Sequence, residues 1–177
     1  MIHVVLFQPE IPQNSGNIIR TCVALNATLH LVKPLGFQVT DKHLKRSGID
    51  YYDEIRILVY ESDNDFFTKN DGEFYFLSRY GRNIYSDVDY KQATKDIYLC
   101  FGSETNGINK SLLAKNIDRT FRIPTAEKVR SLNLSNCVAL VAYEVYRQLD
   151  FIGLSKLEPE SLRGKDYLLK YVEEKGE

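Results

Sequence analysis

Short apolar runs that alternate with helical stretches constrain the fold of this 177-residue chain more than any other feature. The segments Val4–Phe7 and Tyr98–Phe101 are continuously apolar. Such runs are typical of parallel strands that are covered on both faces, and parallel strands are usually joined by helical crossovers. We therefore predict one α/β domain with a mostly parallel sheet flanked by helices.

Six segments rich in Val, Ile, Tyr and Phe are predicted to be strands: Ile2–Phe7, Thr28–Val32, Ile55–Val59, Phe74–Leu77, Ile97–Phe101 and Thr120–Ile123. Helices are predicted at Gly16–Leu25, Lys42–Arg46, Asp63–Lys69, Lys110–Asn116 and Leu134–Leu149. The last of these carries one apolar stripe, made of Leu134, Val138, Val141, Val145 and Leu149. Residues 1–153 are interpreted as the domain. The charged residues 154–177 are expected to form a helical extension rather than a separate domain.

The composition points to a cytoplasmic protein that needs no metal. Cys22, Cys100 and Cys137 are an odd number without CxxC spacing, which argues against a disulfide framework and a zinc site. The apolar run at the N-terminus is short and lacks the basic flank of a signal peptide. No apolar run approaches the roughly 20 residues of a membrane span. Since the net charge is −1, any contact with nucleic acid must be local.

A polar segment, residues 8–21, connects the first predicted strand to the first predicted helix. Backbone N–H groups at such a helix start can bind an anion or a sugar. Asn17 and Arg20 share one face of that helix because they are three residues apart. For this segment alone, a helix cap with a solvated Arg and a ligand site are equally good interpretations. Asn26 is suited to end the helix in a left-handed conformation.

Two more polar segments follow predicted strands. Gly102 and Gly107 bracket a loop in which a ligand can approach the main chain closely. Its spacing matches neither a Walker A loop nor a dinucleotide fingerprint, so taken alone an ordinary turn is the simpler interpretation. Before the long helix, Ser131, Asn133 and Ser135 are three candidate caps. One helix start needs fewer, so some of them are expected to be free for a ligand.

A basic turn and two histidines complete the candidates. Lys42, Lys45 and Arg46 surround one turn of a predicted helix, as either a solvated face or a phosphate contact. His3 and His30 fall in predicted strands and are interpreted as core or edge residues. Metalloprotease, nucleophile-elbow and paired-carboxylate patterns are absent from the sequence.

Taken in order, these segments resemble the SPOUT class of knotted methyltransferases, in the branch that methylates the ribose 2′-hydroxyl of the wobble nucleotide of tRNA. The resemblance covers Met1 to about Gly153. Four motifs carry it: Glu10-Ile11-Pro12, Asn14-x-Gly16-Asn17-Ile18-x-Arg20, Phe101-Gly102-x-Glu104-x-x-Gly107 and Arg130-Ser131-x-Asn133-Leu134-Ser135-Asn136. It implies an α/β fold whose C-terminal part forms a trefoil knot, against the general rule that chains are unknotted. It also implies a homodimer that binds RNA across two subunits, with Leu134–Leu149 as a source of apolar interface.

The resemblance further implies a cofactor and a set of site residues. S-adenosylmethionine would lie among the knot loops, against Leu77, Gly102, Ile123 and Ser131. The catalytic residues would be Arg20, Asn14 and Asn133. The methyl group on a sulfonium is already electrophilic, so no metal is required. The family assigns proton removal to Arg20, but a guanidinium is a poor base. We expect Arg20 to stabilise the developing alkoxide and to hold a phosphate, with the two amides orienting Arg20 or the ribose.

The substrate implied by the resemblance is the anticodon stem-loop of tRNA, in particular of leucine tRNAs. Two other functions stay open: a non-catalytic RNA-binding protein for ribosome assembly on the same fold, and a ribosomal RNA 2′-O-methyltransferase. Retention of Asn14, Arg20 and the full motif from Arg130 to Asn136 favours an enzyme. The absence of an added N-terminal RNA-binding domain favours the wobble-nucleotide enzyme.

Overall fold

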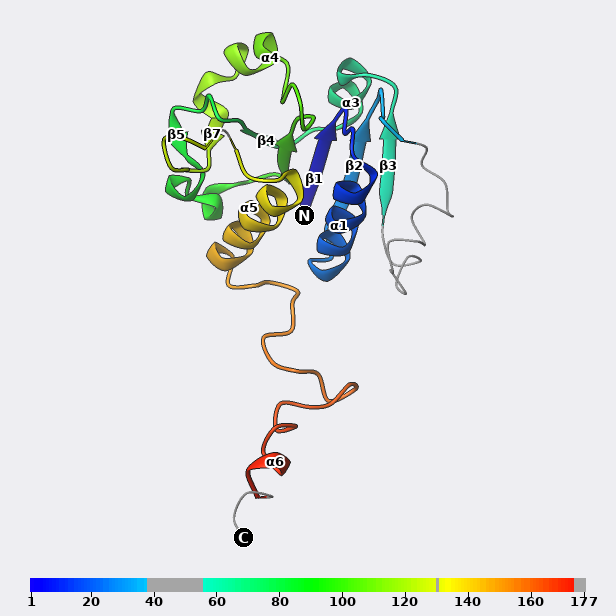
Figure 1. The fold of residues 1–177 in the computed structure, drawn as a ribbon, viewed down its shortest axis with the longest axis vertical. Helices are drawn as coiled ribbons and strands as arrows, with labels where there is room; N and C mark the ends of the chain where they lie inside the picture. The colour runs from blue at the N-terminus through cyan, green and yellow to red at the C-terminus, as the bar shows by residue number, and fades with distance from the viewer. Residues whose placement is uncertain (38–55, 130, 174–177) are drawn as a thin grey trace.

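The computed structural model describes residues 1–37, 56–129 and 131–173 (Figure 1). Its centre is a seven-stranded sheet in the order β3-β2-β1-β6-β4-β7-β5, and every neighbouring pair is parallel. The strands are β1 Ile2–Phe7, β2 Thr28–Val32, β3 Ile57–Tyr60, β4 Glu73–Leu77, β5 Asn83–Ile84, β6 Ile97–Phe101 and β7 Thr120–Arg122. The predicted fold class is confirmed. The trefoil knot stays a prediction, because the strand order does not describe how the chain is threaded.

The helices cover both faces of the sheet, as the continuously apolar strands predicted. They are α1 Pro12–Ala24, α3 Asp63–Lys69, α4 Lys110–Lys115, α5 Leu134–Gln148 and α6 Lys170–Glu173. Val4 and Leu6 of β1 pack with α1 and α5 on one face, whereas Val5 and Phe7 pack with Phe66 of α3 on the other. Each fully buried side chain of this kind contributes roughly 1.5–3 kcal/mol of hydrophobic stabilisation. Figure 1 shows α1 and α5 side by side on the same face, where they contact each other.

Most element boundaries lie within two residues of their predicted positions. The exception is α1, which begins at Pro12 rather than Gly16, because Pro is well suited to the first turn of a helix. Asn26 has a φ of 50°, so the predicted left-handed stop is confirmed. The two-residue strand β5 was not predicted. The helix predicted at Lys42–Arg46, with its basic turn, lies outside the described residues.

The apolar stripe of α5 is buried within its own subunit. Val138, Val141 and Val145 are fully buried in the cluster that α5 shares with α1 and the sheet. The stripe is therefore used by the core of its own subunit, and a dimer contact through this helix would have to use its other positions. That Leu134–Leu149 supplies an apolar interface stays a prediction. Elsewhere on the same helix, Leu140 and Tyr143 are 39% and 47% exposed.

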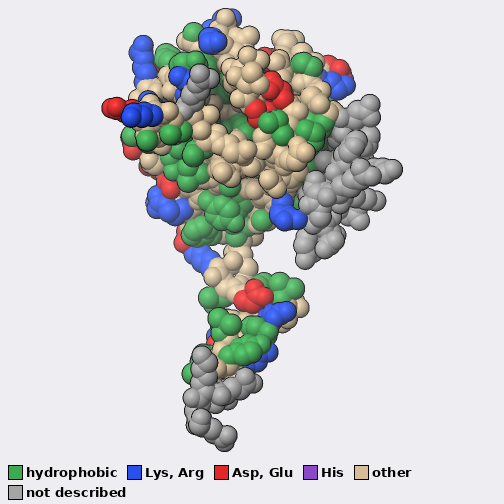
Figure 2. Space-filling model, in the orientation of Figure 1, with side chains coloured by type: hydrophobic (Ala, Val, Ile, Leu, Met, Phe, Trp, Pro, Cys, Tyr) green, Lys and Arg blue, Asp and Glu red, His purple; other side chains and the backbone are tan. Residues whose placement is uncertain are grey.

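The C-terminal extension contains little helix. Among residues 154–173, only Lys170–Glu173 are helical, and the preceding residues form turns and irregular segments. Pro159 and Gly164 interrupt any longer helix, and the φ of Gly164 is +77°. Figure 1 shows this tail leading away from the sheet, and Figure 2 shows apolar side chains on its surface.

Candidate active site

A cavity of about 540 Å³ lies at the carboxyl ends of β4, β6 and β7. Its wall includes Leu77 at the end of β4, Gly102 after β6 and Ile123 after β7. Ser131, shortly before α5, also lines it. The four residues predicted to contact a cofactor therefore lie in one cavity, at the edge of the sheet where open α/β folds bind ligands.

Gly102 is required by the loop itself. A Cβ atom at this position would lie 2.0 Å from the backbone carbon of Gly107 and 2.0 Å from the nitrogen of Ile108. The loop folds back on itself, and the N–H of Gly107 donates to the carbonyl of Ser103 at 2.9 Å. The space beside Gly102 was predicted to admit a ligand, but the loop's own backbone occupies it. A larger residue here would displace the cavity wall.

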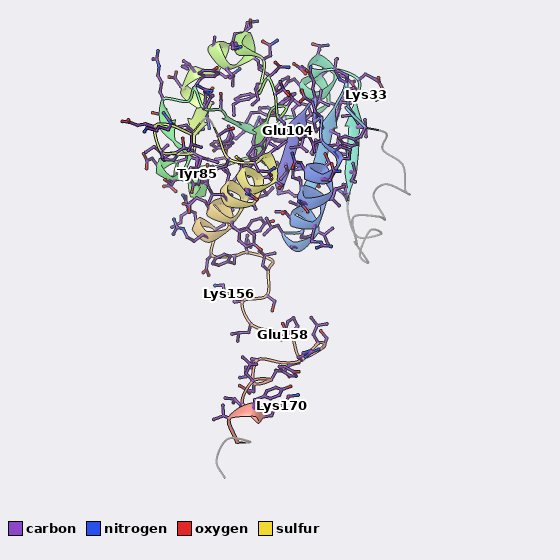
Figure 3. The ribbon with its side chains drawn as sticks, viewed as in Figure 1. Lys33, Tyr85, Glu104, Lys156, Glu158 and Lys170 are labelled. Atoms are coloured by element: carbon purple, nitrogen blue, oxygen red, sulfur yellow. The ribbon has the colours of Figure 1, made fainter. Side chains whose placement is uncertain are left out.

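The carboxylate of Glu104 joins this loop to the start of α1 (Figure 3). Its Oε2 accepts the N–H of Glu10 at 2.8 Å. Its Oε1 accepts the Nδ2 of Asn14 at 2.8 Å and the N–H of Ile11 at 3.2 Å. A carboxylate near a helix N-terminus is also stabilised by the helix dipole. Glu104 belongs to the motif Phe101-Gly102-x-Glu104-x-x-Gly107, in which the sequence alone indicated no role for it.

Asn14 and Asn133 connect α1 to α5. The Nδ2 of Asn133 donates to the Oδ1 of Asn14 at 2.9 Å. The Oδ1 of Asn133 accepts the N–H and the hydroxyl of Ser135 at 2.9 and 2.7 Å, so Asn133 is the cap among the three candidates. Both residues line the cavity. Because their amide groups hydrogen-bond within this network, their geometry suits positioning of the cavity walls better than bond-making chemistry.

Arg20 lies outside the cavity. It is exposed on α1, six residues after Asn14, which is about 9 Å farther along the helix axis. The structure thus brings together six of the seven predicted site residues and leaves the guanidinium on a neighbouring surface.

The structure adds three residues that the sequence analysis did not single out. Arg79, Tyr80 and Arg122 line the side of the cavity formed by the ends of β4 and β7. Arg79 and Tyr80 form a basic and aromatic turn directly after β4, and Arg122 is the last residue of β7. Within the described ranges, no group of three or more His, Cys, Asp and Glu residues is arranged to hold a metal ion.

The two strand histidines belong to the core. The Nδ1 of His3 lies 2.8 Å from the Nε2 of His30, whose Nδ1 lies 2.9 Å from the hydroxyl of Tyr60. Burial, and to a lesser extent the neighbouring His3, lowers the pKa of His30 to about 3. Burial also lowers the pKa of His3, although Asp96 opposes this. Neither histidine lines the cavity, which agrees with the interpretation of both as structural residues.

A larger cavity of about 1030 Å³ lies near the C-terminal end of α1, where Met1, Arg56 and Tyr143 meet the segment Gly153–Lys156. None of the predicted site residues lines it. Size alone therefore does not identify the site. In the parts of the chain that the structure describes, we find no helix with the length and apolar character needed to cross a membrane.

Comparison with known proteins identifies the family of the chain. The model of the SpoU rRNA Methylase family matches residues 1–143. A protein from Geobacillus stearothermophilus is 51% identical over 155 residues, which cover 87% of this chain and 99% of that protein. The tRNA (cytidine(34)-2′-O)-methyltransferase of Saccharophagus degradans is 40% identical over 156 residues, which cover 86% of this chain and 99% of that protein.

Solved structures show the same similarity. A Bacillus anthracis protein superposes with a TM-score of 0.84 at 49% identity, covering 90% of this chain and all of that one. A protein described in connection with 2-OH methylation of C/U34 on tRNA superposes with a TM-score of 0.78 at 38% identity. The superposition covers 85% of this chain and 97% of that one. The AdoMet-bound rRNA methyltransferase of Sinorhizobium meliloti superposes with a TM-score of 0.72 at 27% identity, covering 84% of this chain and 56% of that one.

Proposed function

The chain belongs to the SpoU rRNA Methylase family, and we propose that it methylates the ribose 2′-hydroxyl of the wobble nucleotide, cytidine or uridine 34, of tRNA. The observation that carries this proposal is the single cavity that gathers Leu77, Gly102, Ile123 and Ser131 at one edge of the sheet. A relative named for 2′-O-methylation of cytidine 34 aligns with this chain over 99% of its own length.

The cavity fits S-adenosylmethionine as the methyl donor. Its volume of about 540 Å³ falls within the range of small-molecule sites. Leu77 and Ile123 offer apolar surface, and the loop at Gly102 offers main-chain groups. When bound, the cofactor supplies a methyl group that is already electrophilic. The residues of this chain have to align the acceptor hydroxyl and assist loss of its proton.

Arg20 is the proposed catalytic residue. Its guanidinium would stabilise the negative charge that develops on the ribose oxygen, and would hold an adjacent phosphate. Asn14 and Asn133 are proposed as positioning residues, because their amides join Glu104 to the start of α5. Their rigidity would keep the cofactor loops at a constant distance from the helix that carries Arg20.

The proposed substrate element is the anticodon stem-loop, in particular that of leucine tRNAs, and the proposed site of action is the cytoplasm. We also propose a homodimer that binds RNA across two subunits. The position of Arg20 supports this, since it does not line the cavity of its own subunit and could serve that of a partner. Sedimentation at micromolar concentration should then show a species of two 20.5 kDa chains rather than one.

A ribosomal RNA substrate is the second candidate, because the family is named for rRNA and one solved relative is an rRNA methyltransferase. Nucleosides of tRNA and rRNA from wild-type and deletion cells, compared by mass spectrometry, separate the two. We expect loss of 2′-O-methylated pyrimidine from tRNA alone. Loss from rRNA alone would favour the second candidate, and no loss from either would favour a non-catalytic RNA-binding protein.

A further inference from the structure

A tight turn at the rim of the cavity presents an aromatic ring and a guanidinium together. The N–H of Gly81 donates to the carbonyl of Ser78 at 3.1 Å, which places Arg79 and Tyr80 at the two central positions of a β-turn. The turn follows β4 directly, and both of its central residues line the cavity.

The turn is anchored to β7. The N–H of Ser78 donates to the carbonyl of Phe121 at 2.9 Å. Gly81 packs so closely that a Cβ atom there would lie 2.3 Å from the backbone carbon of Phe121. Pairing of Asn83 with Phe121 holds the chain on the other side of the turn. The tip is therefore preorganised, which lowers the entropy cost of binding a ligand.

The side chains at the tip, Arg79 and Tyr80, are both exposed. Tyr80 is 56% exposed, and the guanidinium carbon of Arg79 lies 5.2 Å from its ring centroid. Across the parts of the chain that the structure describes, neither Arg79 nor Arg122 has an acidic partner. The carboxylate of Glu104 in the same cavity already accepts three hydrogen bonds. This side of the cavity is thus locally basic and aromatic in a protein of net charge −1.

We propose that Tyr80 stacks on the base of the nucleotide whose ribose is methylated, while Arg79 and Arg122 bind the phosphates beside it. The proposal rests on the proposed function and names the residues that recognise its substrate. Single-stranded RNA is bound by aromatic stacking combined with arginine contacts to the backbone. Stacking tolerates any base because each has a π-face, so a tyrosine can serve cytidine and uridine alike.

The test is a cycle that removes the two stacking partners separately. Tyr80→Ala, Tyr80→Phe and the control Tyr171→Ala, which removes a tyrosine that is 48% exposed in the tail, are assayed with intact tRNA and with tRNA abasic at position 34. With intact tRNA, Tyr80→Ala should weaken binding roughly 5- to 150-fold. Tyr80→Phe and the control should stay within about twofold of wild type. With the abasic tRNA, Tyr80→Ala should have little further effect.

S-adenosylhomocysteine affinity and melting temperature are measured for each variant. Both should be unchanged in Tyr80→Ala, since the ring is exposed. An equal penalty on intact and abasic tRNA would overturn the proposal. A parallel loss of S-adenosylhomocysteine affinity would overturn it too, by assigning the turn to the cofactor. If wild type methylates position 34 while Tyr80→Ala binds normally, only this inference fails. If wild type does not methylate tRNA, the proposed function itself fails.

Discussion

Glu104 is a single side chain that joins segments 90 or more positions apart in the sequence. Its carboxylate accepts hydrogen bonds from Glu10, Ile11 and Asn14, and Asn14 in turn contacts the cap of α5. All three donors require acceptor oxygens, so the charge and the shape of the carboxylate both matter. The cavity walls depend on this connection more than on any one contact to a ligand.

Replacing Glu104 with Gln should destabilise the protein and loosen the cavity. One oxygen becomes an NH₂ group that faces N–H donors, and a hydrogen bond to a charged group is worth about 1.5–3 kcal/mol. We expect a fall of about 2–3 kcal/mol in the free energy of unfolding, with weaker S-adenosylhomocysteine binding. Glu127→Gln, at an exposed position, is the matched control. Equal urea midpoints for the two variants would contradict this role.

Arg20→Ala should separate catalysis from folding. The side chain is exposed and does not line the cavity, so melting temperature and S-adenosylhomocysteine affinity should stay close to wild type. Loss of a group that stabilises developing charge should slow single-turnover methyl transfer by about 100-fold or more. Lys115→Ala on α4 controls for removal of an exposed cation. A near wild-type rate in Arg20→Ala would show that another group performs this role.

The sequence motifs predicted which residues gather at the site but not what each of them does. Gly102 and Asn133 were identified because they lie in recognisable polar segments that follow strands. Their contacts, to the Gly107–Ile108 backbone and to Asn14, depend on how distant segments meet, which local patterns do not contain. Tyr80 was not identified because an exposed tyrosine in a turn has no distinctive spacing.

Secondary structure could be predicted where apolar periodicity is strong. The strand β1 and the helix α5 have clear patterns, and both end within one residue of their predicted limits. The first turn of α1 is polar and lacks such a pattern, so its start was misplaced. The strand β5, at Asn83–Ile84, is too short to have a period. What α5 buries could not be predicted either, because a stripe does not show whether it faces its own sheet or a partner.

The hydrogen-bonded histidines of β1 and β2 should make the fold acid-sensitive. Burial holds the pKa of His30 at about 3 in the folded protein, against 6.5 for an ordinary histidine. As the pH falls, the unfolded chain therefore binds a proton at His30 at a higher pH than the folded protein does. Stability should be fully present above about pH 6.5 and fall as pH decreases toward 3, by about 1 kcal/mol per pH unit.

His30→Gln tests this within the window between pH 6.5 and 5.5, where carboxylates hardly titrate. Urea denaturation of wild type should show a clear loss of stability across this window. The variant, with one less buried histidine, should show a smaller loss even if it is less stable overall. An identical slope in the two proteins would contradict the assignment of the acid sensitivity to His30.

At the scale of the whole molecule, the parallel sheet could be predicted but its strand order could not. Continuous apolar runs indicate strands with both faces covered, whereas the order β3-β2-β1-β6-β4-β7-β5 depends on which edges pair. That order places β6, β4 and β7 side by side, and the cavity lies at their carboxyl ends. The charged composition of the tail also did not predict its conformation, since Pro159 and Gly164 break the helix that was expected.

Truncation after Leu157 should leave the fold and the cavity intact. Phe151 and Leu154 pack against the core and are retained, while Leu162, Leu168 and Leu169 beyond the cut are at least 60% exposed. A relative aligns over 99% of its own length with only 87% of this chain. We expect an unchanged melting temperature and unchanged S-adenosylhomocysteine affinity. A drop of several degrees would show that the tail belongs to the domain.

In the proposed reaction one hydroxyl group, the ribose 2′-OH of nucleotide 34, accepts the methyl group. The most direct test uses purified protein, radiolabelled S-adenosylmethionine and two tRNAs that differ only by a 2′-deoxy sugar at position 34. We expect about one methyl group per molecule of the ribose form and none on the deoxy form, with similar binding of both. Equal labelling of the two tRNAs, or label recovered at another nucleotide, would contradict it.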